Sequence, residues 1–148
     1  MAGGRERAPA HPADPALAAA FAATTYRVSL AAREIDIRIG RRNAALDFLL
    51  EETAATTWAF LTGWNPQGGV AGRTPENLAR GEELRRACAG FRCHEGAGLA
   101  EEGSDHPAEQ SLLVLGIGRA EAVEVGRRFG QLAVVVGTRG MAAELVWC

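Results

Sequence analysis

Hydrophobic and polar residues alternate from Tyr26 to about Gly40, a pattern typical of half-buried strands. Ile35, Ile37 and Ile39 fall on one face of this stretch, with charged residues between them. The alternation predicts a β-hairpin. The next segment changes to helical spacing of its apolar residues and begins with an asparagine suited to cap a helix, so a helix with one apolar face is expected there.

Two continuous apolar runs farther along the chain predict buried strands. The run TTWAFLTGW is rich in β-branched and aromatic residues and stops before Pro66, which cannot continue regular pairing. The run SLLVLGIG is apolar on both faces, as expected of a central strand. The segment FRCHEGAGLA, which precedes the second run, predicts a weaker strand at a sheet edge.

Helix signals separate these strands. Thr74 stands at an N-cap position, Pro75 at the first helical position and Asn77 at the capping-box position, with Gly90 as terminator. The segment RAEAVEVGRRFG predicts a second helix that ends at Gly130, and two short strands follow it.

From Thr56 to Gly137 the predicted order is strand, helix, strand, strand, helix, strand. This is the order of the ferredoxin-like βαββαβ arrangement, which belongs to the α+β class. The strands at 57–62 and 112–117 are then antiparallel neighbours, and the helices that start near Thr74 and Arg119 cover one face of the sheet. The amino-terminal hairpin and helix extend or cover that sheet.

The chain of 148 residues is long enough for one domain with its own core. Residues 1–16 are rich in Ala, Pro and Gly and predict a flexible tail, so the α+β domain is assigned to residues 17–148. The short apolar run after the tail predicts a helix rather than an export signal. No apolar run approaches the roughly 20 residues that cross a bilayer, so no membrane association is expected.

Charge and cysteine content exclude several classes of function. A net charge of −2 argues against a broad basic face for nucleic acid. Three irregularly spaced cysteines do not form a secreted disulfide framework and favour the cytoplasm. The spacing of Cys88, Cys93, His94 and His106 matches no common zinc pattern, so neither a metal nor a cofactor is expected.

Polar residues that are distant in sequence converge in the predicted topology. The first core strand ends at Trp64 and Asn65, while the third, antiparallel to it, begins near Glu109. The second helix returns to the same end of the sheet at Gln131, and Asn77 lies in the first turn of the helix that starts there. These residues are therefore expected to form one cluster.

The segments TGWNP, PEN, EQSLLVLGI and FGQLAVVV, in this order, resemble the bacterial domain of unknown function 3293 family from about Tyr26 onward. The family commonly has a small residue between the Thr and Trp of the first motif, as Gly63 is here. Because the family has no established activity, the resemblance implies positions rather than a reaction. The positions that match its motifs are Thr62, Trp64, Asn65, Pro66, Asn77, Glu109, Ser111 and Gln131.

Each of these residues also has a purely structural interpretation. Asn65 before Pro66 can make an Asx turn, and the Trp64 indole can cap the core. The other amides and the carboxylate can satisfy loop or helix backbone groups. An anion site in GIGRAEAVEVG lacks a dinucleotide fingerprint, and a Ser111–His106 nucleophile pair lacks the surrounding motif of a hydrolase.

The sequence therefore predicts a bacterial cytoplasmic α+β domain that binds a small polar ligand or a partner segment through Trp64, Asn65, Glu109 and Gln131. An enzyme is the alternative, with Glu109 as general acid or base, Asn65 and Gln131 orienting the substrate, and Trp64 desolvating the carboxyl group. A protein interaction domain with open sheet edges is a third possibility. A concave pocket around Glu109 would favour a ligand or chemistry over a flat protein contact.

Overall fold

The computed structural model describes residues 14–68 and 71–148. Most of the predicted tail lies outside these ranges. Asp14, Pro15 and Ala16 do not belong to a tail: the Asp14 carboxylate accepts a 3.0 Å hydrogen bond from the Ala16 amide and caps helix α1, which begins at Pro15. No helix in the described ranges has both the length and the apolar character needed to span a bilayer.

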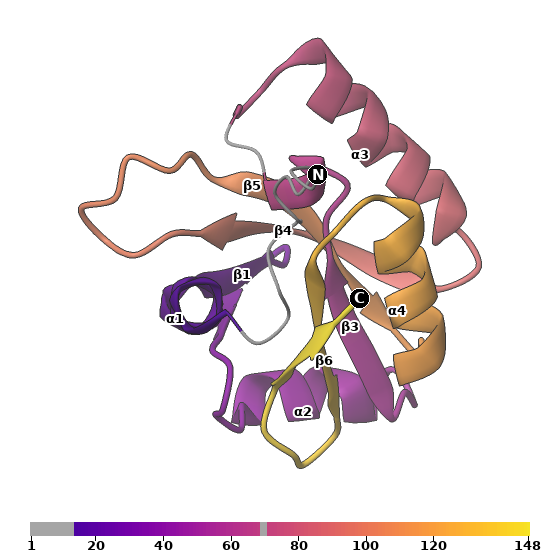
Figure 1. Ribbon diagram of the computed structural model, residues 1–148. Helices are drawn as coiled ribbons and strands as arrows, with labels where there is room; N and C mark the ends of the chain where they lie inside the picture. The colour runs from indigo at the N-terminus through magenta and orange to yellow at the C-terminus, as the bar shows by residue number, and fades with distance from the viewer. Residues whose placement is uncertain (1–13, 69–70) are drawn as a thin grey trace, which may run out of the picture.

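The described strands form one antiparallel sheet in the order β2-β1-β4-β5-β3-β6-β7 (Figure 1). The amino-terminal strands pair as the predicted hairpin, and the two apolar runs become β3 and β5. The strands are β1 (Thr25–Ser29), β2 (Glu34–Ile37), β3 (Thr57–Leu61), β4 (Arg92–Leu99), β5 (Glu109–Leu115), β6 (Ala133–Thr138) and β7 (Glu144–Trp147).

The helices begin at the capping residues that the sequence indicates. The Asn43 side chain accepts a hydrogen bond from the Leu46 amide, and the Thr74 hydroxyl accepts one from the Asn77 amide. The second of these helices ends at Ala87, earlier than Gly90 predicts. The helices are α1 (Pro15–Ala23), α2 (Ala44–Glu52), α3 (Pro75–Ala87), α4 (Arg119–Arg128) and the short 3-10 helix η2 (Pro66–Gly68).

The predicted central pair is confirmed, because β3 and β5 are antiparallel neighbours with Trp58 opposite Leu115 and Leu61 opposite Leu112. The prediction that β4 is an edge strand is wrong. Strand β1 pairs with the side of β4 that faces away from β5, with Val28 opposite Gly96. The amino-terminal hairpin thus extends the sheet and satisfies the backbone groups that an edge strand would leave open.

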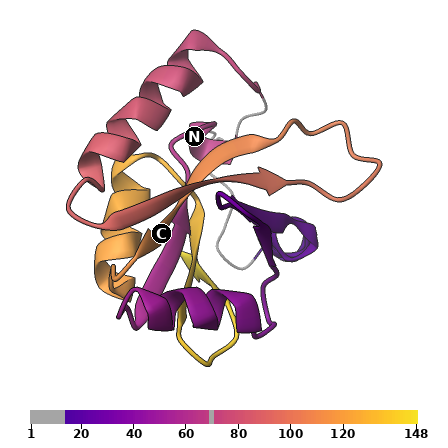
Figure 2. The same ribbon diagram turned by 180° about the vertical axis from the view of Figure 1, so that it is seen from behind.

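Each face of the sheet has its own apolar core. Helices α3 and α4 cover one face, as predicted, where Leu84 and Ala122 pack against residues such as Leu61 and Val134. Helix α2 covers the opposite face (Figure 2). The core on that face contains Tyr26, Val28, Ile35, Ile37, Leu46, Leu49, Leu50, Trp58, Phe60, Leu113, Leu115, Val135 and Ala143.

The sheet curls around the α2 side. Ile39, just after β2, forms an isolated bridge with Ala143, just before β7, and the Gly40 amide donates a 2.8 Å hydrogen bond to the Ala143 carbonyl. The two ends of the sheet therefore meet near α2, which fills this end of the curled face. Helix α1 lies near the other end, beside the loop between β4 and β5 (Figures 1 and 2).

Gly63 lets α3 approach the end of β3 closely. A Cβ atom at this position would lie 2.8 Å from the backbone carbonyl oxygen of Arg80, which is closer than real Cβ contacts. Because the obstacle is helix backbone, a side-chain rotation cannot relieve it. The small residue between Thr62 and Trp64 is thus required by backbone packing.

Candidate functional site

Asn65 lies in the turn between the central strand β3 and η2 and is almost fully buried. Its backbone has a φ of 51°, in the left-handed region that asparagine tolerates better than most residues. This conformation turns the chain from β3 into η2, and the η2 turn is closed by a 3.0 Å hydrogen bond from the Gly68 amide to the Asn65 carbonyl. The Asn-Pro motif therefore forms a buried corner of the fold.

A pair of reciprocal hydrogen bonds fixes the orientation of two asparagine side chains. The Asn65 backbone amide donates to Asn77 Oδ1 at 2.9 Å, so the other end of the Asn77 side chain must be its NH₂ group. That group donates to Asn65 Oδ1 at 2.8 Å and to the Gly72 carbonyl at 2.7 Å. The NH₂ group of Asn65 must then point away from Asn77.

The Asn65 NH₂ group donates a 2.7 Å hydrogen bond to Glu109 Oε2, at the start of β5. Glu109 Oε1 accepts no hydrogen bond from the residues that the structure describes. Burial raises the pKa of this carboxyl group above its usual range, although the hydrogen bond from Asn65 and the nearby His106 both lower it. Glu109 is thus a partly buried acid with one oxygen held and the other available.

The other motif side chains bond to backbone near this carboxyl group. Thr62 Oγ1 donates to the Gln110 carbonyl at 2.7 Å and accepts from the Trp64 amide at 3.0 Å. Ser111 Oγ donates to the Glu109 carbonyl at 2.9 Å. The Gln131 NH₂ group donates to the Trp64 carbonyl at 2.9 Å and to the Phe129 carbonyl at 3.2 Å. These bonds connect the ends of β3, β5 and α4.

A pocket of about 310 Å³ opens beside Glu109, between α1, the β4–β5 loop and the ends of β3, β5 and β6. Its volume lies at the lower end of the range for small-molecule sites. Most of its lining is apolar. The described lining residues are Leu17, Ala20, Phe21, Ala23, Thr24, Tyr26, Phe60, Thr62, Asn65, Gly68, Gly98, Ala100, Glu101, Ser104, His106, Pro107, Glu109, Ser111, Gln131, Leu132, Ala133, Val134 and Val135.

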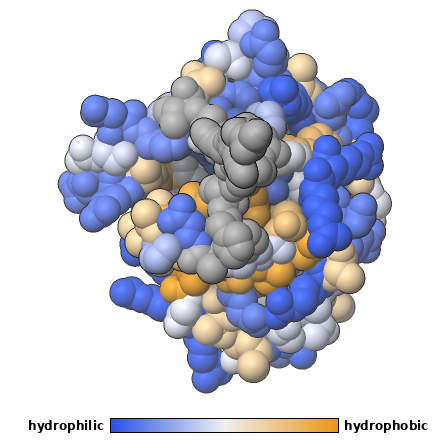
Figure 3. All heavy atoms as spheres, in the orientation of Figure 1, coloured by the Kyte–Doolittle hydropathy of each residue, from blue (hydrophilic) through white to orange (hydrophobic). Residues whose placement is uncertain are grey.

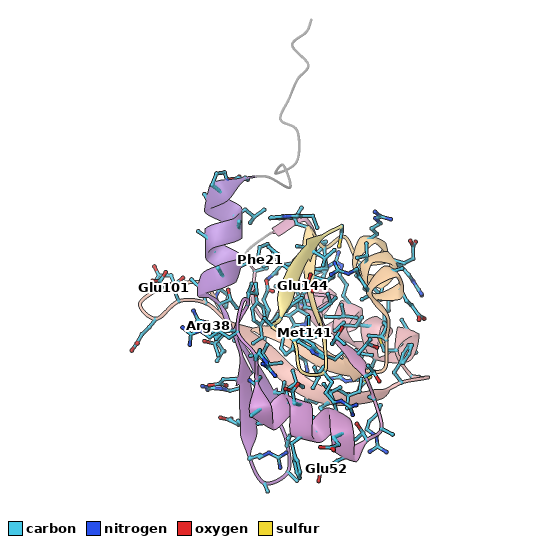
Figure 4. All side chains as sticks on the ribbon, turned by 90° about the horizontal axis from the view of Figure 1, so that it is seen from below. Phe21, Arg38, Glu52, Glu101, Met141 and Glu144 are labelled. Atoms are coloured by element: carbon cyan, nitrogen blue, oxygen red, sulfur yellow. The ribbon has the colours of Figure 1, made fainter. Side chains whose placement is uncertain are left out.

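The carboxyl-terminal end of α1 is fastened over this pocket. The Tyr26 hydroxyl donates a 2.8 Å hydrogen bond to the Phe21 carbonyl, and Arg38 donates one of 3.1 Å to the Ala22 carbonyl. The Phe21 ring packs edge-on against Trp147 with 5.9 Å between ring centroids. Figure 4 shows Phe21 on α1 and Glu101 in the neighbouring loop, while Glu52 lies at the far end of the molecule.

Five of the eight predicted positions line the pocket, namely Thr62, Asn65, Glu109, Ser111 and Gln131. The others lie behind or beside it. Asn77 holds Asn65 from behind, and Pro66 lines a separate hollow between α3 and the end of α4.

The Trp64 indole points toward α3, where its Nε1 would lie 3.4 Å from a Cβ atom on Gly81. This nitrogen is buried and has no hydrogen-bond partner in the described structure. The aromatic lining of the pocket comes from Phe21, Tyr26 and Phe60 instead of Trp64. The expected desolvation of Glu109 by Trp64 therefore has no basis in this geometry.

Sequence reasoning missed the contribution of α1 and of the β4–β5 loop. Neither segment carries a motif, and α1 reads only as a short apolar helix. Hydrophobic spacing could not indicate that Phe21 and Leu17 would lie beside Glu109. His106, which was considered only as a zinc ligand or a base for Ser111, also lines the pocket.

Alternative chemistry at these residues finds little support. The Ser111 hydroxyl is bonded to backbone, and His106 Nδ1 lies 3.2 Å from the Pro107 carbonyl, so the two side chains are not joined. Among the described residues, no three His, Cys, Asp or Glu side chains are grouped as metal ligands. Cys88, Cys93 and Cys148 are all free thiols in the structure.

On the face that Figure 3 shows, apolar surface gathers near the middle, between the α1 and α4 sides of the molecule, and hydrophilic surface surrounds it.

The family model described as "Protein of unknown function (DUF3293)" matches residues 61–134. This range begins at the end of β3 and includes α3, β4, β5, α4 and the start of β6. No curated protein and no solved structure matches the chain.

Proposed function

Starting from the fact that this chain belongs to the DUF3293 family, we propose that the domain binds a small ligand in the pocket beside Glu109. The observation that carries the proposal is a partly buried carboxyl group with one free oxygen at the wall of a 310 Å³ pocket. This oxygen is not one of the buried unpaired atoms of the described structure, so it is accessible to a ligand. The apolar walls provide contact area for the ligand, and Glu109 orients the ligand in the pocket.

The polar residues around Glu109 support a binding role over the catalytic one. Both ends of the Asn65 amide are occupied, by Asn77 and by Glu109, so neither is free to orient a substrate. The Gln131 NH₂ group is likewise committed to two backbone carbonyls. Of the three side chains, only the Glu109 carboxyl group can carry a charge, and its Oε1 accepts no hydrogen bond from the described residues.

The shape of the site favours a small ligand over a partner segment. Docking of a peptide strand needs an open sheet edge. In the described structure the pocket instead lies among α1, a loop and strand ends.

An enzyme with Glu109 as general acid or base is a second candidate function. It is favoured by the raised pKa of this carboxyl group, because a catalytic acid works best when its pKa lies near the working pH. In that case turnover of the bound ligand would disappear in Glu109→Gln, while ligand binding would remain measurable. A ligand recovered chemically unchanged after prolonged incubation with the wild type would argue against catalysis.

We also infer a ferredoxin-like topology for the core and a bacterial cytoplasmic location. The order β4-β5-β3-β6, with α3 and α4 packed on one face, supports the first inference. Free cysteines without a disulfide framework support the second. Comparison of purified domain from cytoplasmic and periplasmic fractions of a native host would test the location.

The experiment that tests the binding function is a thermal-shift screen of a metabolite library against three proteins. These are the wild type, Glu109→Gln, and Glu52→Gln, which makes the same chemical change at an exposed site on α2 remote from the pocket (Figure 4). We expect at least one compound to raise the melting temperature of the wild type and of Glu52→Gln, and to act weakly on Glu109→Gln. A hit that acts equally on all three proteins, or no hit at all, would contradict the proposal.

A further inference from the structure

Building on the proposed binding function, we propose that the ligand is a small amphiphilic amine, with its ammonium group at Glu109 and its apolar body against Phe21, Phe60 and Leu132. This names the class of ligand, which the binding proposal leaves open. The inference depends on the charges that line the pocket, on the polarity of the hydrogen-bond network behind Glu109, and on the orientation of α1.

The charged side chains that line the described pocket are acidic. Glu101 and Glu109 are present, while none of the described lining residues is an arginine. The sequence contains no lysine, so arginine and histidine are the only cationic side chains available. His106 is the one histidine among the described lining residues. An anionic ligand would therefore meet two carboxylates, and a cationic ligand would be attracted by them.

Arg38, which holds the end of α1, donates hydrogen bonds to other acceptors. These are the Ala22 carbonyl at 3.1 Å and Thr25 Oγ1 at 3.3 Å. Arg38 forms no ion pair with Glu109. The partly buried carboxylate thus has no ion pair with a described arginine, which leaves it available to a cationic ligand.

The hydrogen-bond network requires Glu109 to be an acceptor. The backbone amide of Asn65 can only donate, and this fixes first Asn77 and then the Asn65 side chain, as described above. The Asn65 NH₂ group therefore always presents a donor to Glu109 Oε2. This arrangement supports a carboxylate, and a charged donor from the ligand at Oε1 would complete its coordination.

Helix α1 adds a second feature that favours a cation. Its carboxyl-terminal residues Ala20, Phe21 and Ala23 line the pocket, so the negative end of the helix dipole is directed to this site. The last turn of α1 carries no basic residue. The carbonyl oxygens of Ala20, Phe21 and Ala22 accept hydrogen bonds from Thr24, Tyr26 and Arg38, so the helix end contributes its partial negative charge to the pocket and not a set of open acceptors.

The apolar walls set the remaining chemistry of the ligand. Leu17 and Phe21 come from α1, Phe60 from β3, and Leu132 and Val135 from the segment around β6. A fully polar cation such as a metal ion or a short diamine would leave these walls in contact with water. A hydrocarbon or aromatic body would be buried against them, with about 25 cal/mol gained for each Å² of apolar area removed from water.

The test compares three compounds with the same body and different head groups: 2-phenylethylamine, 2-phenylethanol and 3-phenylpropionate. Binding is measured at neutral pH by ligand-observed NMR titration. We expect the amine to bind at least about tenfold more tightly than the alcohol, because hydrogen bonds between charged groups are about twice as strong as neutral ones. The carboxylate should bind more weakly than either.

Three variants then test which residue causes the preference for the amine over the alcohol. Glu109→Gln should remove the preference for the amine over the alcohol, and Glu52→Gln should retain it. Glu101→Gln, at the pocket mouth, should reduce the preference by a smaller factor, because this residue is exposed and screened by solvent. If Glu109→Gln does not fold, the comparison of amine with alcohol on the wild type decides by itself.

The outcomes separate this inference from the binding function. If the alcohol or the carboxylate binds as tightly as the amine or more tightly, the proposal of an amine ligand is wrong, while the pocket is still a binding site. Binding of the amine that is unchanged in Glu109→Gln also overturns it, because the head group would then lie elsewhere. If none of the three compounds binds and the metabolite screen also finds nothing, both proposals fail.

Discussion

Asn65 Nδ2 donates a 2.7 Å hydrogen bond to Glu109 Oε2, joining two residues that are 44 positions apart in the sequence. Asn65 lies in the turn that follows the central strand β3, and Glu109 begins its antiparallel neighbour β5. The bond exists because antiparallel pairing places the end of one strand beside the start of the other. It holds a carboxyl group at the wall of the pocket, and this gives the contact its functional interest.

Glu109→Gln should leave the free energy of unfolding at neutral pH unchanged or raise it. The amide oxygen of Gln can still accept the hydrogen bond from Asn65, while the substitution removes the cost of burying an ionised carboxylate. Urea denaturation of the wild type, Glu109→Gln and Glu52→Gln at constant m-value would measure this. A clear loss of stability in Glu109→Gln alone would show that the charge supports the fold and would weaken the case for a binding site.

The same carboxyl group should make stability depend on pH. Its pKa is raised by burial in the folded state, so the folded protein holds the proton more strongly than the unfolded chain does. This contribution to stability is fully present below the unfolded pKa and is lost as pH rises through the folded pKa.

Between mildly acidic and neutral pH, the wild type should therefore lose stability relative to Glu109→Gln. Tyr26, His106 and Glu101 face the same pocket, and the charge of His106 lowers the pKa of Glu109. A His106→Gln background removes that second group and provides the control. Parallel curves for wild type and Glu109→Gln against pH would refute the raised pKa.

Asn77→Ala should destabilise the domain by about 1–3 kcal/mol, because it leaves the buried Asn65 amide and the Gly72 carbonyl without their partners. Glu83→Ala is a matched control on the exposed side of the same helix, where no hydrogen bond or ion pair is lost. Chemical denaturation measures both. Equal stabilities of the two variants would mean that water replaces the Asn77 side chain without cost.

Gly63→Ala should cost about 1–3 kcal/mol, since the new methyl group would lie 2.8 Å from the Arg80 carbonyl oxygen. Gly90→Ala adds the same methyl group where no atom lies within 4 Å, and it should change stability little. Melting temperatures of the two variants give the comparison. A Gly63→Ala protein as stable as Gly90→Ala would show that α3 can shift away from β3 freely.

Cys88 should react slowly with iodoacetamide in the folded protein. Its thiol is buried, and burial raises its pKa to about 11, so little thiolate is present at neutral pH. Mass spectrometry after timed alkylation should find Cys88 unmodified until urea unfolds the chain. Rapid native labelling of Cys88 would indicate local opening of the packing between α3 and the sheet.

The cysteine content also leads to a prediction for the purified protein. Under reducing conditions we expect neither an intramolecular disulfide nor stoichiometric zinc. Elemental analysis and intact mass would measure both. About one zinc per chain, lost in Cys93→Ser, would contradict this expectation.

The sequence by itself determined the local elements of this protein and the pairing of its two central strands. Alternation in β1 and β2, helix caps at Asn43 and Thr74, and the double-faced apolar runs of β3 and β5 are all properties of neighbouring residues. Such signals depend on periodicity and capping among residues that are close together in the sequence, so the sequence alone reveals them. The convergence of Asn65 and Glu109 followed from strand direction alone.

Only the tertiary structure determined which strand pairs with the second side of β4 and which residues form the walls of the pocket. Whether β4 is an edge strand depends on where the amino-terminal hairpin packs, and the sequence of β4 does not indicate this. The side-chain direction of Trp64 depends on the packing of α3, and the position of α1 beside Glu109 depends on contacts with Tyr26, Arg38 and Trp147. These contacts join segments far apart in the chain, and their energies come from packing and burial that exist only once the sheet has curled.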